Sequence, residues 1–247
     1  MSEAPRVAAF RPDDGRLAAA EETLESLGVN PVGDPMLAVE ATGESPRSDA
    51  DFAVLTSVTG AELVGRADWA FDGTLCAIGA STASALRERG YEVDVVPEEF
   101  SSTGLVAALG DSVAGERVEI ARSDHGSEAL PEGLNAAGAF VHETTLYRLV
   151  RPPESGESAA LAAAGELDGV LFTSSLTVSH FIAAAAERGV REAAIEGLDA
   201  AVVGAIGAPT AETAREHGIS VDVIPDTADF EALAAATTKR LDAPDAR

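Results

Sequence analysis

Residues 78–97 read IGASTASALRERGYEVDVVP, and residues 206–225 read IGAPTAETAREHGISVDVIP. The two stretches align without a gap at an offset of 128 residues. A shorter echo precedes each copy, with VLTS at residues 54–57 and LFTS at residues 171–174. The copies lie much further apart than the roughly 20 to 50 residues of a solenoid repeat. The sequence therefore predicts two similar domains that offer the same kind of loops to one ligand.

The composition is compatible with two domains of ordinary size. The chain has 247 residues, of which 46% are hydrophobic and only 4% aromatic. A chain of this length can bury sizeable cores. Because aromatic residues are scarce, these cores must consist mostly of Ala, Val, Leu and Ile.

The charge is strongly acidic, with a formal net charge of -25 at pH 7 and Lys239 as the only lysine. Such a charge can repel nucleic acid, bind cations or solvate the surface. The carboxylates are scattered and form no calcium-binding loop, so a solvated acidic surface is favoured. This pattern looks like that of proteins from salt-loving organisms, in which salt screens the self-repulsion. A nucleic-acid partner is not expected, because the required basic patch is missing.

The cysteine content and the N-terminus indicate a cytoplasmic protein without membrane partners. Cys76 is the only cysteine and lies in an apolar run, where a small buried side chain is expected. An intrachain disulfide is impossible, as is usual for cytoplasmic proteins. The N-terminus shows no secretory signal pattern, and no apolar run approaches the roughly 20 residues of a membrane span.

Short apolar runs alternate with amphipathic stretches. Strands are predicted at residues 6–10, 52–55, 75–78, 93–96, 117–121, 139–145, 169–172, 200–203 and 221–224. Helices are predicted at residues 17–27, 59–64, 83–89, 103–109, 127–137, 176–187, 210–216 and 230–241. This alternation predicts an α/β fold with parallel sheets covered by helices on both faces. The short units favour flavodoxin-like domains with five-stranded sheets.

The strands are unevenly distributed, which predicts that one domain is inserted into the other. Five predicted strands fall in the central segment, whereas only three follow residue 155. The N-terminal strand and helix would complete the second sheet. We therefore expect a discontinuous domain of residues 1–37 plus 153–247 and an inserted domain of residues 38–152. Two connectors near residues 36–39 and 146–150 would then form a hinge.

Ligands of open α/β sheets bind beyond the carboxyl ends of the strands, where the repeated elements lie. Backbone N–H groups and hydroxyls at such a helix start bind anions. The candidates are Thr56, Ser57, Gly79, Thr82, Thr173, Ser174, Gly207 and Thr210. The alternatives are plain N-caps for the threonines, tight turns for the glycines and strand-end caps for the Thr-Ser pairs. Arg11 and Arg122 follow strands and either bind the ligand or solvate the surface.

Common catalytic sets are missing from the sequence. It has no HExxH zinc motif, no GxSxG elbow, no Walker loop and no GxGxxG helix start, so no metal or nucleotide cofactor is expected. His142 is expected to face solvent on an edge strand. Tyr147 lies in a predicted connector. Its side chain either points towards the cleft between the predicted domains or packs as an apolar residue with its hydroxyl in contact with water.

Taken in order, several stretches resemble the uroporphyrinogen-III synthase family over nearly the whole chain. They are FRP at residues 10–12, VLTS at 54–57, IGASTA at 78–83, SSTGL at 101–105, LPEGLNAAG at 130–138, LYRLV at 146–150, LFTSS at 171–175 and IGAPTA at 206–211. Their order and spacing are more specific than any one motif.

The resemblance implies an enzyme that cyclises hydroxymethylbilane to uroporphyrinogen III, with inversion of ring D and loss of water. It implies a lyase of haem, sirohaem and cobalamin synthesis that needs no cofactor. It also implies two domains joined by a two-stranded linker, in a monomer that contacts the preceding enzyme of the pathway. The family's tyrosine corresponds to Tyr147, which is expected to assist departure of the substrate hydroxyl. Hydroxyls expected to bind substrate include Ser81, Thr82, Ser101, Ser102, Thr173, Ser174, Ser175 and Thr210.

The chain departs from the family pattern at two positions. Ser175 stands where proline is frequent, and Pro209 stands where threonine or serine is common. A second function class also stays open, because two such domains around a hinge suit a non-catalytic protein that binds a small polyanion.

Overall fold

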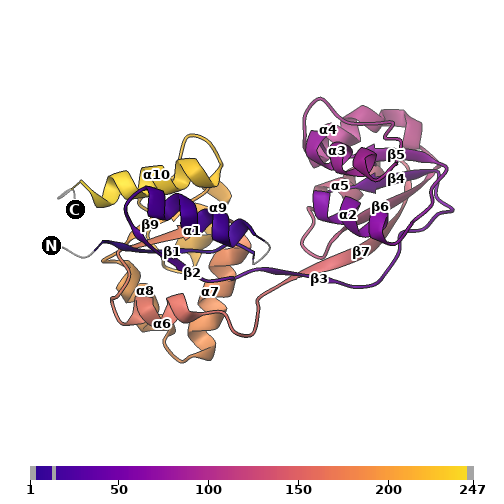
Figure 1. Ribbon diagram of the computed structural model, residues 1–247. Helices are drawn as coiled ribbons and strands as arrows, with labels where there is room; N and C mark the ends of the chain where they lie inside the picture. The colour runs from indigo at the N-terminus through magenta and orange to yellow at the C-terminus, as the bar shows by residue number, and fades with distance from the viewer. Residues whose placement is uncertain (1–3, 13–14, 244–247) are drawn as a thin grey trace. The chain divides into compact units, whose positions relative to one another are not determined.

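The computed structural model describes residues 4–12 and 15–243 (Figure 1). The chain divides into two compact units. Unit 1 comprises the residues up to 38 together with those from 150 onwards, and unit 2 comprises residues 39–149. Both units are built from helices and mainly parallel strands, so the predicted α/β class is confirmed.

Unit 1 contains a four-stranded sheet in the order β2-β1-β8-β9. Its strands are β1 (Arg6–Ala9), β2 (Asn30–Gly33), β8 (Gly169–Phe172) and β9 (Val202–Ala205). All neighbouring strands are parallel. One isolated bridge between Gly204 and Val223 continues the sheet beyond β9. The order corresponds to a flavodoxin-like sheet whose fifth strand is reduced to a single bridge.

Helices cover both faces of this sheet. One core, which includes Leu24, Leu171 and Leu233, lies under α1 and α10, and another surrounds Phe172 and Phe181 under the remaining helices. The alternating burial of the strands explains the two cores, because successive side chains point to opposite faces. The helices of unit 1 are α1 (Arg16–Ser26), α6 (Glu157–Ala163), α7 (Ser175–Glu187), α8 (Arg191–Leu198), α9 (Ala208–Glu216) and α10 (Phe230–Leu241).

Unit 2 contains a five-stranded sheet in the order β3-β7-β6-β4-β5. Its strands are β3 (Ala38–Ala41), β4 (Phe52–Leu55), β5 (Thr74–Ala77), β6 (Arg117–Ser123) and β7 (Phe140–Val150). Its helices are α2 (Val58–Arg66), α3 (Ala80–Glu88), α4 (Ser102–Leu109), the 3-10 helix η1 (Gly110–Val113) and α5 (Ala129–Ala136). One core lies under α2 and α3, and the other lies under α4, η1 and α5.

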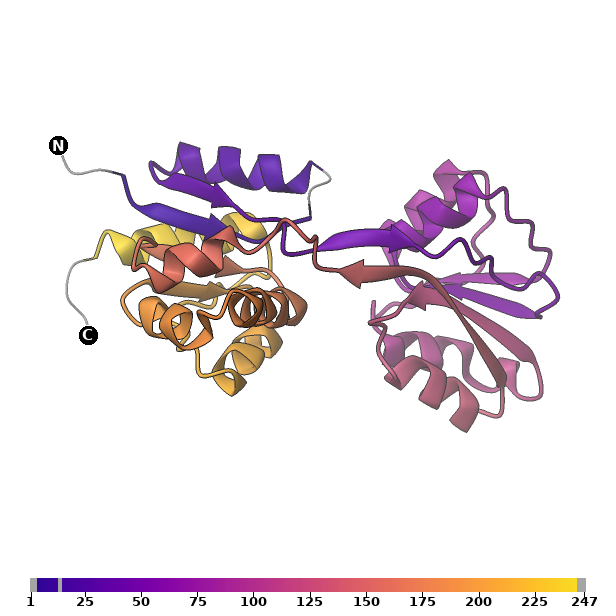
Figure 2. The ribbon, with the colours of Figure 1, turned by 90° about the horizontal axis from the view of Figure 1, so that it is seen from below.

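The chain leaves unit 1 through β3 and returns through β7, and these strands are neighbours in the sheet. Figure 2 shows the violet β3 and the salmon β7 side by side, with arrows in opposite directions. No helix within the described residues is long and apolar enough to cross a membrane.

The repeated stretches adopt the same local structure. Gly79 and Gly207 are the N-caps of α3 and α9, and both have extended backbones. Asp94 accepts a hydrogen bond from the backbone N–H of Leu75 at 2.8 Å, and Asp222 accepts one from that of Val203 at 2.9 Å. The repeat in the sequence therefore marks a repeat of strand, helix and returning segment.

Matched through this repeat, the two sheets have the same spatial order but a different chain order. β4 and β5 correspond to β8 and β9, so β6 and β7 correspond to β1 and β2. In unit 2, β6 and β7 follow the repeated stretch along the chain, whereas in unit 1 their counterparts β1 and β2 precede it. The two units are therefore related by a circular permutation of one sheet.

Several predicted elements were wrong. Residues 93–96 and 221–224 form no strand beyond the single bridges at Val95 and Val223, and β3 is the fifth strand of unit 2 instead. Five elements were not predicted, namely β2, β3, α6, α8 and the 3-10 helix η1. β2 contains Pro31, and it lies at the sheet edge where a strand tolerates proline.

Candidate active site

A cavity of about 240 Å³ opens at the carboxyl end of the sheet in unit 2. Segments that follow β4, β5 and β6 line it, together with the second half of β7. This is the edge at which open α/β sheets bind ligands. Five residues predicted from the sequence meet there, namely Thr56, Ser57, Ser102, Arg122 and Tyr147.

Tyr147 lies between the core and the cavity. Its side chain is 6% exposed and belongs to the core under α2 and α3. Its hydroxyl donates a hydrogen bond to Ser57 Oγ at 3.0 Å. The pairing of β6 with β7 is irregular here, because Arg122 lies opposite Thr145 whereas Ser123 lies opposite Tyr147. Such an irregularity redirects a side chain, and here it lets a strand residue line the cavity.

Ser57 is the N-cap of α2. Its Oγ accepts the backbone N–H of Gly60 at 2.9 Å, which satisfies a donor that the first helical turn leaves without a partner. Ser57 therefore both begins a helix and lines the cavity. The expected strand-end cap is confirmed as an N-cap, and that role is compatible with ligand binding.

Three helices begin at this edge of unit 2. α2 begins after Ser57, α3 after Gly79 and α4 after Ser101, whose Oγ accepts the backbone N–H of Gly104 at 2.9 Å. The N-terminus of a helix carries partial positive charge. Together with the hydroxyls around them, these helix starts can bind carboxylates without a basic pocket.

The threonines of the repeat do not cap their helices. Gly79 and Gly207 are the N-caps, while Thr82 and Thr210 lie within the first turn and are each 4% exposed. The N-cap alternative was therefore wrong for both threonines. Ser81 is exposed beside Thr82. Substrate contacts of these residues stay predictions.

Arg122 is held by protein groups. It donates to the carbonyl of Ser127 at 2.8 Å and to Glu128 at 2.8 Å, and it pairs with Glu143 at 2.6 Å. The side chain is nearly buried, so the surface-solvation alternative was wrong. A Cβ at Gly126 would approach the Arg122 side chain at 2.5 Å, so a larger residue there would displace the Arg122 guanidinium. Arg122 was predicted to offer positive charge to a ligand. The carboxylates of Glu128 and Glu143 offset that charge.

Unit 1 collects the second set of predicted residues at the equivalent sheet edge. Ser174 is the N-cap of α7 and forms a capping box with Thr177. Thr173 donates to the carbonyl of Phe10 at 2.6 Å, which joins the ends of β8 and β1. The Arg11 guanidinium lies 5.3 Å from the ring centre of Phe230, a cation–π arrangement.

The two departures from the family pattern contact each other. Ser175 Oγ donates to the carbonyl of Pro209 at 3.2 Å. This bond connects the start of α7 to the start of α9, beside Gly207. The bond depends on the hydroxyl of Ser175 but not on the side chain at position 209, because its acceptor is a backbone carbonyl.

The loop after β6 contributes cavity residues that the sequence reasoning missed. Ser123, His125 and Ser127 line the cavity, and His125 Nδ1 lies 2.8 Å from Asp124 Oδ1. Burial acts to raise the pKa of Asp124, but hydrogen bonds from His125 and from the Leu149 backbone outweigh it and lower that pKa. A run of small polar residues after a predicted strand was the signal that could have identified this loop.

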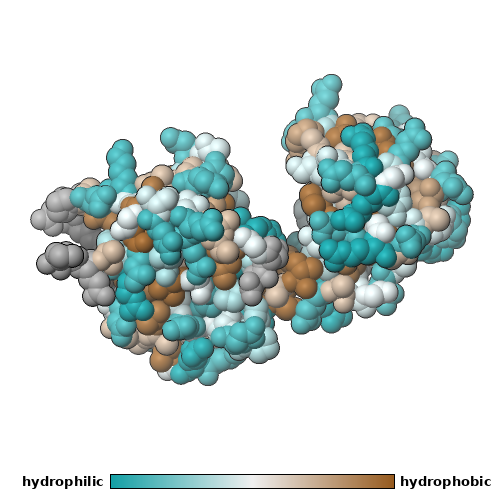
Figure 3. All heavy atoms as spheres, in the orientation of Figure 1, coloured by the Kyte–Doolittle hydropathy of each residue, from teal (hydrophilic) through white to brown (hydrophobic). Residues whose placement is uncertain are grey.

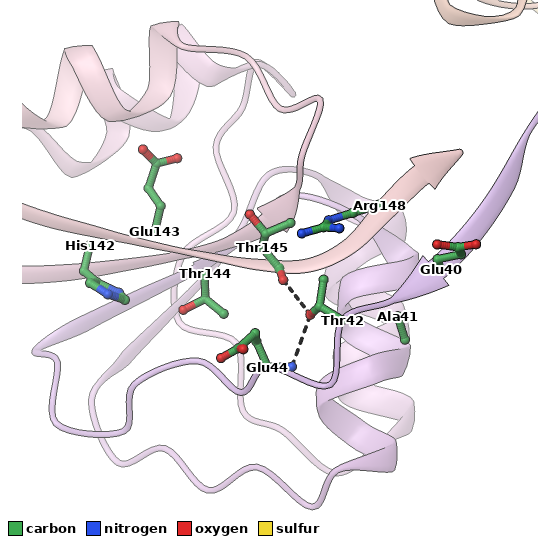
Figure 4. A pocket seen from close by; sticks show the side chains of 9 residues that line it. All are labelled: Glu40, Ala41, Thr42, Glu44, His142, Glu143, Thr144, Thr145 and Arg148. Atoms are coloured by element: carbon green, nitrogen blue, oxygen red, sulfur yellow. Dashed lines mark hydrogen bonds between the residues drawn. The ribbon is translucent and has the colours of Figure 1, made fainter. Parts of the chain in front are cut away.

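A larger cavity of about 600 Å³ lies between β3 and β7 (Figure 4). Thr42 joins the two strands there by donating to the carbonyl of Thr145 at 2.7 Å. The wall of this cavity includes Glu40, Glu44 and Glu143, and Arg148 is the one arginine among the described residues that line it. None of the predicted site residues line this cavity. His142 lines it as well and is half exposed, as predicted, but its strand β7 is not the predicted edge strand, because β3 lies beyond it in the sheet.

Comparison with known proteins identifies the family. The profile described as uroporphyrinogen-III synthase HemD matches residues 18–235. The chain belongs to the uroporphyrinogen-III synthase family. A candidate uroporphyrinogen-III synthase of Methanothermobacter thermautotrophicus is 33% identical over 231 residues, which cover 87% of this chain and 90% of the relative. The uroporphyrinogen-III synthase of Chlorobaculum parvum is 26% identical over 168 residues, or 67% of this chain and 65% of the relative.

Solved structures of uroporphyrinogen-III synthases share the fold. A variant of the Thermus thermophilus enzyme superposes with a TM-score of 0.65 at 22% identity, covering 96% of this chain and 98% of the other. The Helicobacter pylori enzyme gives a TM-score of 0.62 at 15% identity, covering 94% and 97%. The resemblance found in the sequence motifs is thus confirmed for both the family and the fold class.

Proposed function

We propose that this protein is a uroporphyrinogen-III synthase, which converts hydroxymethylbilane to uroporphyrinogen III with inversion of ring D and release of water. Its product would serve the synthesis of haem, sirohaem or cobalamin. Membership of the family supports the reaction. The cavity in which Tyr147 contacts Ser57 is the observation that supports assigning the reaction to particular residues.

The substrate is a linear tetrapyrrole rich in carboxylates. Hydroxyls, helix starts and a few arginines can hold such a molecule by charge-assisted hydrogen bonds. We assign this role to Arg11, Thr56, Ser57, Gly79, Ser81, Thr82, Ser101, Ser102, Arg122, Thr173, Ser174, Ser175, Gly207 and Thr210. Arg122 would also order the loop that its ion pairs hold.

The reaction needs mainly the correct geometry. The hydroxyl leaves a carbon that an electron-rich pyrrole activates, so modest acid assistance suffices. The greater task is to hold rings A and D close enough for a spiro intermediate, a contribution of proximity and orientation. In this proposal the phenol of Tyr147 assists departure of the hydroxyl. No metal or organic cofactor takes part in this proposal.

The two units would act as the two domains of the enzyme, with boundaries near residues 37/38 and 152/153. In this proposal β3 and β7 form the two-stranded linker, and one domain is inserted into the other. Movement about the linker would allow substrate entry and product release. The proposed setting is the cytoplasm of a cell with high internal salt. There the protein would act as a monomer that receives its labile substrate from the preceding enzyme.

A coupled assay tests the function. Purified protein in high-salt buffer receives freshly made hydroxymethylbilane, and the oxidised products are separated into isomers I and III. Isomer III in excess over a heat-unfolded control is the expected result. Isomer I alone, from protein shown by circular dichroism to be folded, would leave a non-catalytic polyanion-binding protein as the function.

A further inference from the structure

The protein fills both acceptor positions of the Ser57 hydroxyl. A serine hydroxyl offers one proton and two lone pairs. The backbone N–H of Gly60 donates to Ser57 Oγ at 2.9 Å, and the Tyr147 hydroxyl donates to it at 3.0 Å. Among the residues that the structure describes, none accepts a hydrogen bond from Ser57. Its proton is therefore left for a ligand in the cavity that Ser57 lines.

Both donors make the remaining proton of Ser57 a stronger hydrogen-bond donor. The N–H of Gly60 belongs to the first turn of α2, where the helix carries partial positive charge. Hydrogen bonds in a chain also polarise one another. Tyr147 is placed differently, since its ring is buried and its proton is already directed at Ser57. Ser57 is thus the member of the pair that offers a proton to the cavity.

Unit 1 lacks this arrangement among its described residues. Ser174 is the equivalent N-cap, and its Oγ accepts the backbone N–H of Thr177 at 3.2 Å. The residue that completes its capping box is a threonine of the same helix, and the strand equivalent to β7 is β2 (NPVG), which contains no tyrosine. Duplication therefore copied the cap, whereas the tyrosine donor belongs to unit 2.

We propose that Ser57 is a catalytic residue that donates a proton to the departing hydroxyl of the substrate, and that Tyr147 is a positioning residue that acts through Ser57. This inference rests on the proposed synthase function. The C–O bond breaks, the pyrrole electrons stabilise the cation, and the hydroxyl leaves as water with the Ser57 proton. Tyr147 returns a proton to Ser57 Oγ. The phenolate regains its proton from the pyrrole carbon that loses one when ring closure is complete.

A double-mutant cycle tests whether Tyr147 acts through Ser57. The proteins are the wild type, Ser57→Gly, Tyr147→Phe and the double variant, and the readouts are kcat and KM for isomer III. Glycine is chosen because it is tolerated at N-cap positions. Each single change should lower kcat about tenfold or more, as loss of general-acid assistance does. The double variant should be at most about twofold slower than Ser57→Gly, because residues that act as a unit are non-additive.

Three further variants separate chemistry from folding. Ser57→Thr retains a hydroxyl and an N-cap, and should keep kcat within about threefold of the wild type. Ser57→Asn retains a cap oxygen, but its amide cannot transfer a proton, so it should be as slow as Ser57→Gly. Ser112→Ala removes a serine hydroxyl that donates only to the Leu109 carbonyl in the same unit, and should leave kcat unchanged. Circular dichroism confirms that each variant is folded.

The outcomes distinguish this inference from the function on which it rests. Absence of isomer III with the wild type contradicts the synthase function itself. Wild-type kcat in either Ser57→Gly or Ser57→Asn overturns the role of Ser57. If Tyr147→Phe lowers kcat by the same factor in the wild-type and Ser57→Gly backgrounds, then Tyr147 acts on the substrate directly. The proposal that Tyr147 acts through Ser57 is then wrong.

Discussion

Tyr147 reaches Ser57 because β7 is irregular where it passes the end of β6. The shift after Arg122 brings Tyr147 opposite Ser123 and so to the cavity. A bulge of this kind leaves no clear trace in the hydrophobic pattern. The sequence therefore placed Tyr147 at the site through its connector position and the family resemblance, but it could not reveal the bond to Ser57. The polar contacts of Arg122 were likewise hidden, because they depend on how the loop after β6 folds back.

The single cysteine should be unreactive in the folded protein. Cys76 is fully buried in β5, and burial, with a smaller contribution from Asp94, raises the pKa of its thiol to about 12. The reactive thiolate is then almost absent at pH 8. We expect no reaction with a disulfide reagent under native conditions in high salt, and one equivalent of reaction after unfolding. Rapid native labelling would contradict the burial of Cys76.

The same thiol makes stability depend on pH in alkali. The ordinary pKa of 9.0 applies to the unfolded chain, and about 12 applies to the folded one. Because only the unfolded state ionises between these values, stability is fully present below pH 9 and is lost as the pH rises towards 12. Chemical denaturation of wild type and Cys76→Ala at several pH values measures this. The wild type should lose stability relative to Cys76→Ala only above about pH 9.

At the scale of elements, Asp34 provides the cap that α6 lacks locally. The N-cap of α6 is Gly156, which has no side chain, and the buried Asp34 carboxylate accepts from the backbone N–H groups of Gly156 and Ser158 at 2.9 Å. It also accepts from the Ser158 hydroxyl. Asp34→Ala would leave three buried donors without an acceptor, and we expect a loss of about 3 kcal/mol in the free energy of unfolding.

The N-cap of α10 offers a matched control for this change. Asp229 accepts one backbone N–H, from Ala232 at 2.7 Å, and is only half-buried. Asp229→Ala should cost about 1 kcal/mol, the usual cost of a lost cap. Urea denaturation compares the two variants with the wild type. Equal losses would mean that Asp34 is no more than an ordinary cap.

The failures of element prediction have local causes. VDVV at residues 93–96 has the composition of a strand, but Pro97 follows it and cannot donate to a ladder. The Asp94 side chain, rather than a longer backbone ladder, bonds the Leu75 N–H, and only Val95 forms a bridge. The helices α6 and α8 were missed because they are short and rich in alanine, so their apolar periodicity is weak.

At the scale of the whole molecule, the repeat was visible in the sequence but its permutation was not. Two copies of one motif indicate two similar units, yet the strands that complete each sheet have no recognisable similarity. Their equivalence follows from register, since Ile120 lies opposite Val54 and Ala9 lies opposite Leu171 within the matched VLTS and LFTS stretches. Two residues further on, Arg122 and Arg11 occupy equivalent positions. Each unit thus has an arginine, a Thr-Ser pair and a glycine helix start at the carboxyl edge of its sheet.

The charge of the molecule predicts how its stability depends on salt. Hydrophilic residues dominate the face seen in Figure 3, and the formal net charge is -25. The screening length for repulsion among surface carboxylates is about 3 Å at 1 M salt and about 10 Å at 0.1 M, so the repulsion reaches further at low salt. We therefore expect the melting temperature to rise steeply with KCl concentration and the fold to loosen below roughly 1 M.

Differential scanning calorimetry in KCl, with sucrose as the control, measures this effect. Sucrose stabilises proteins by exclusion from their surface but screens no charge. KCl should therefore raise the melting temperature much more than sucrose does at low ionic strength, and the two should converge above roughly 1 M KCl. A melting temperature that does not respond to KCl would show that the acidic surface does not destabilise the fold. Any effect of salt on turnover would then arise in catalysis rather than in folding.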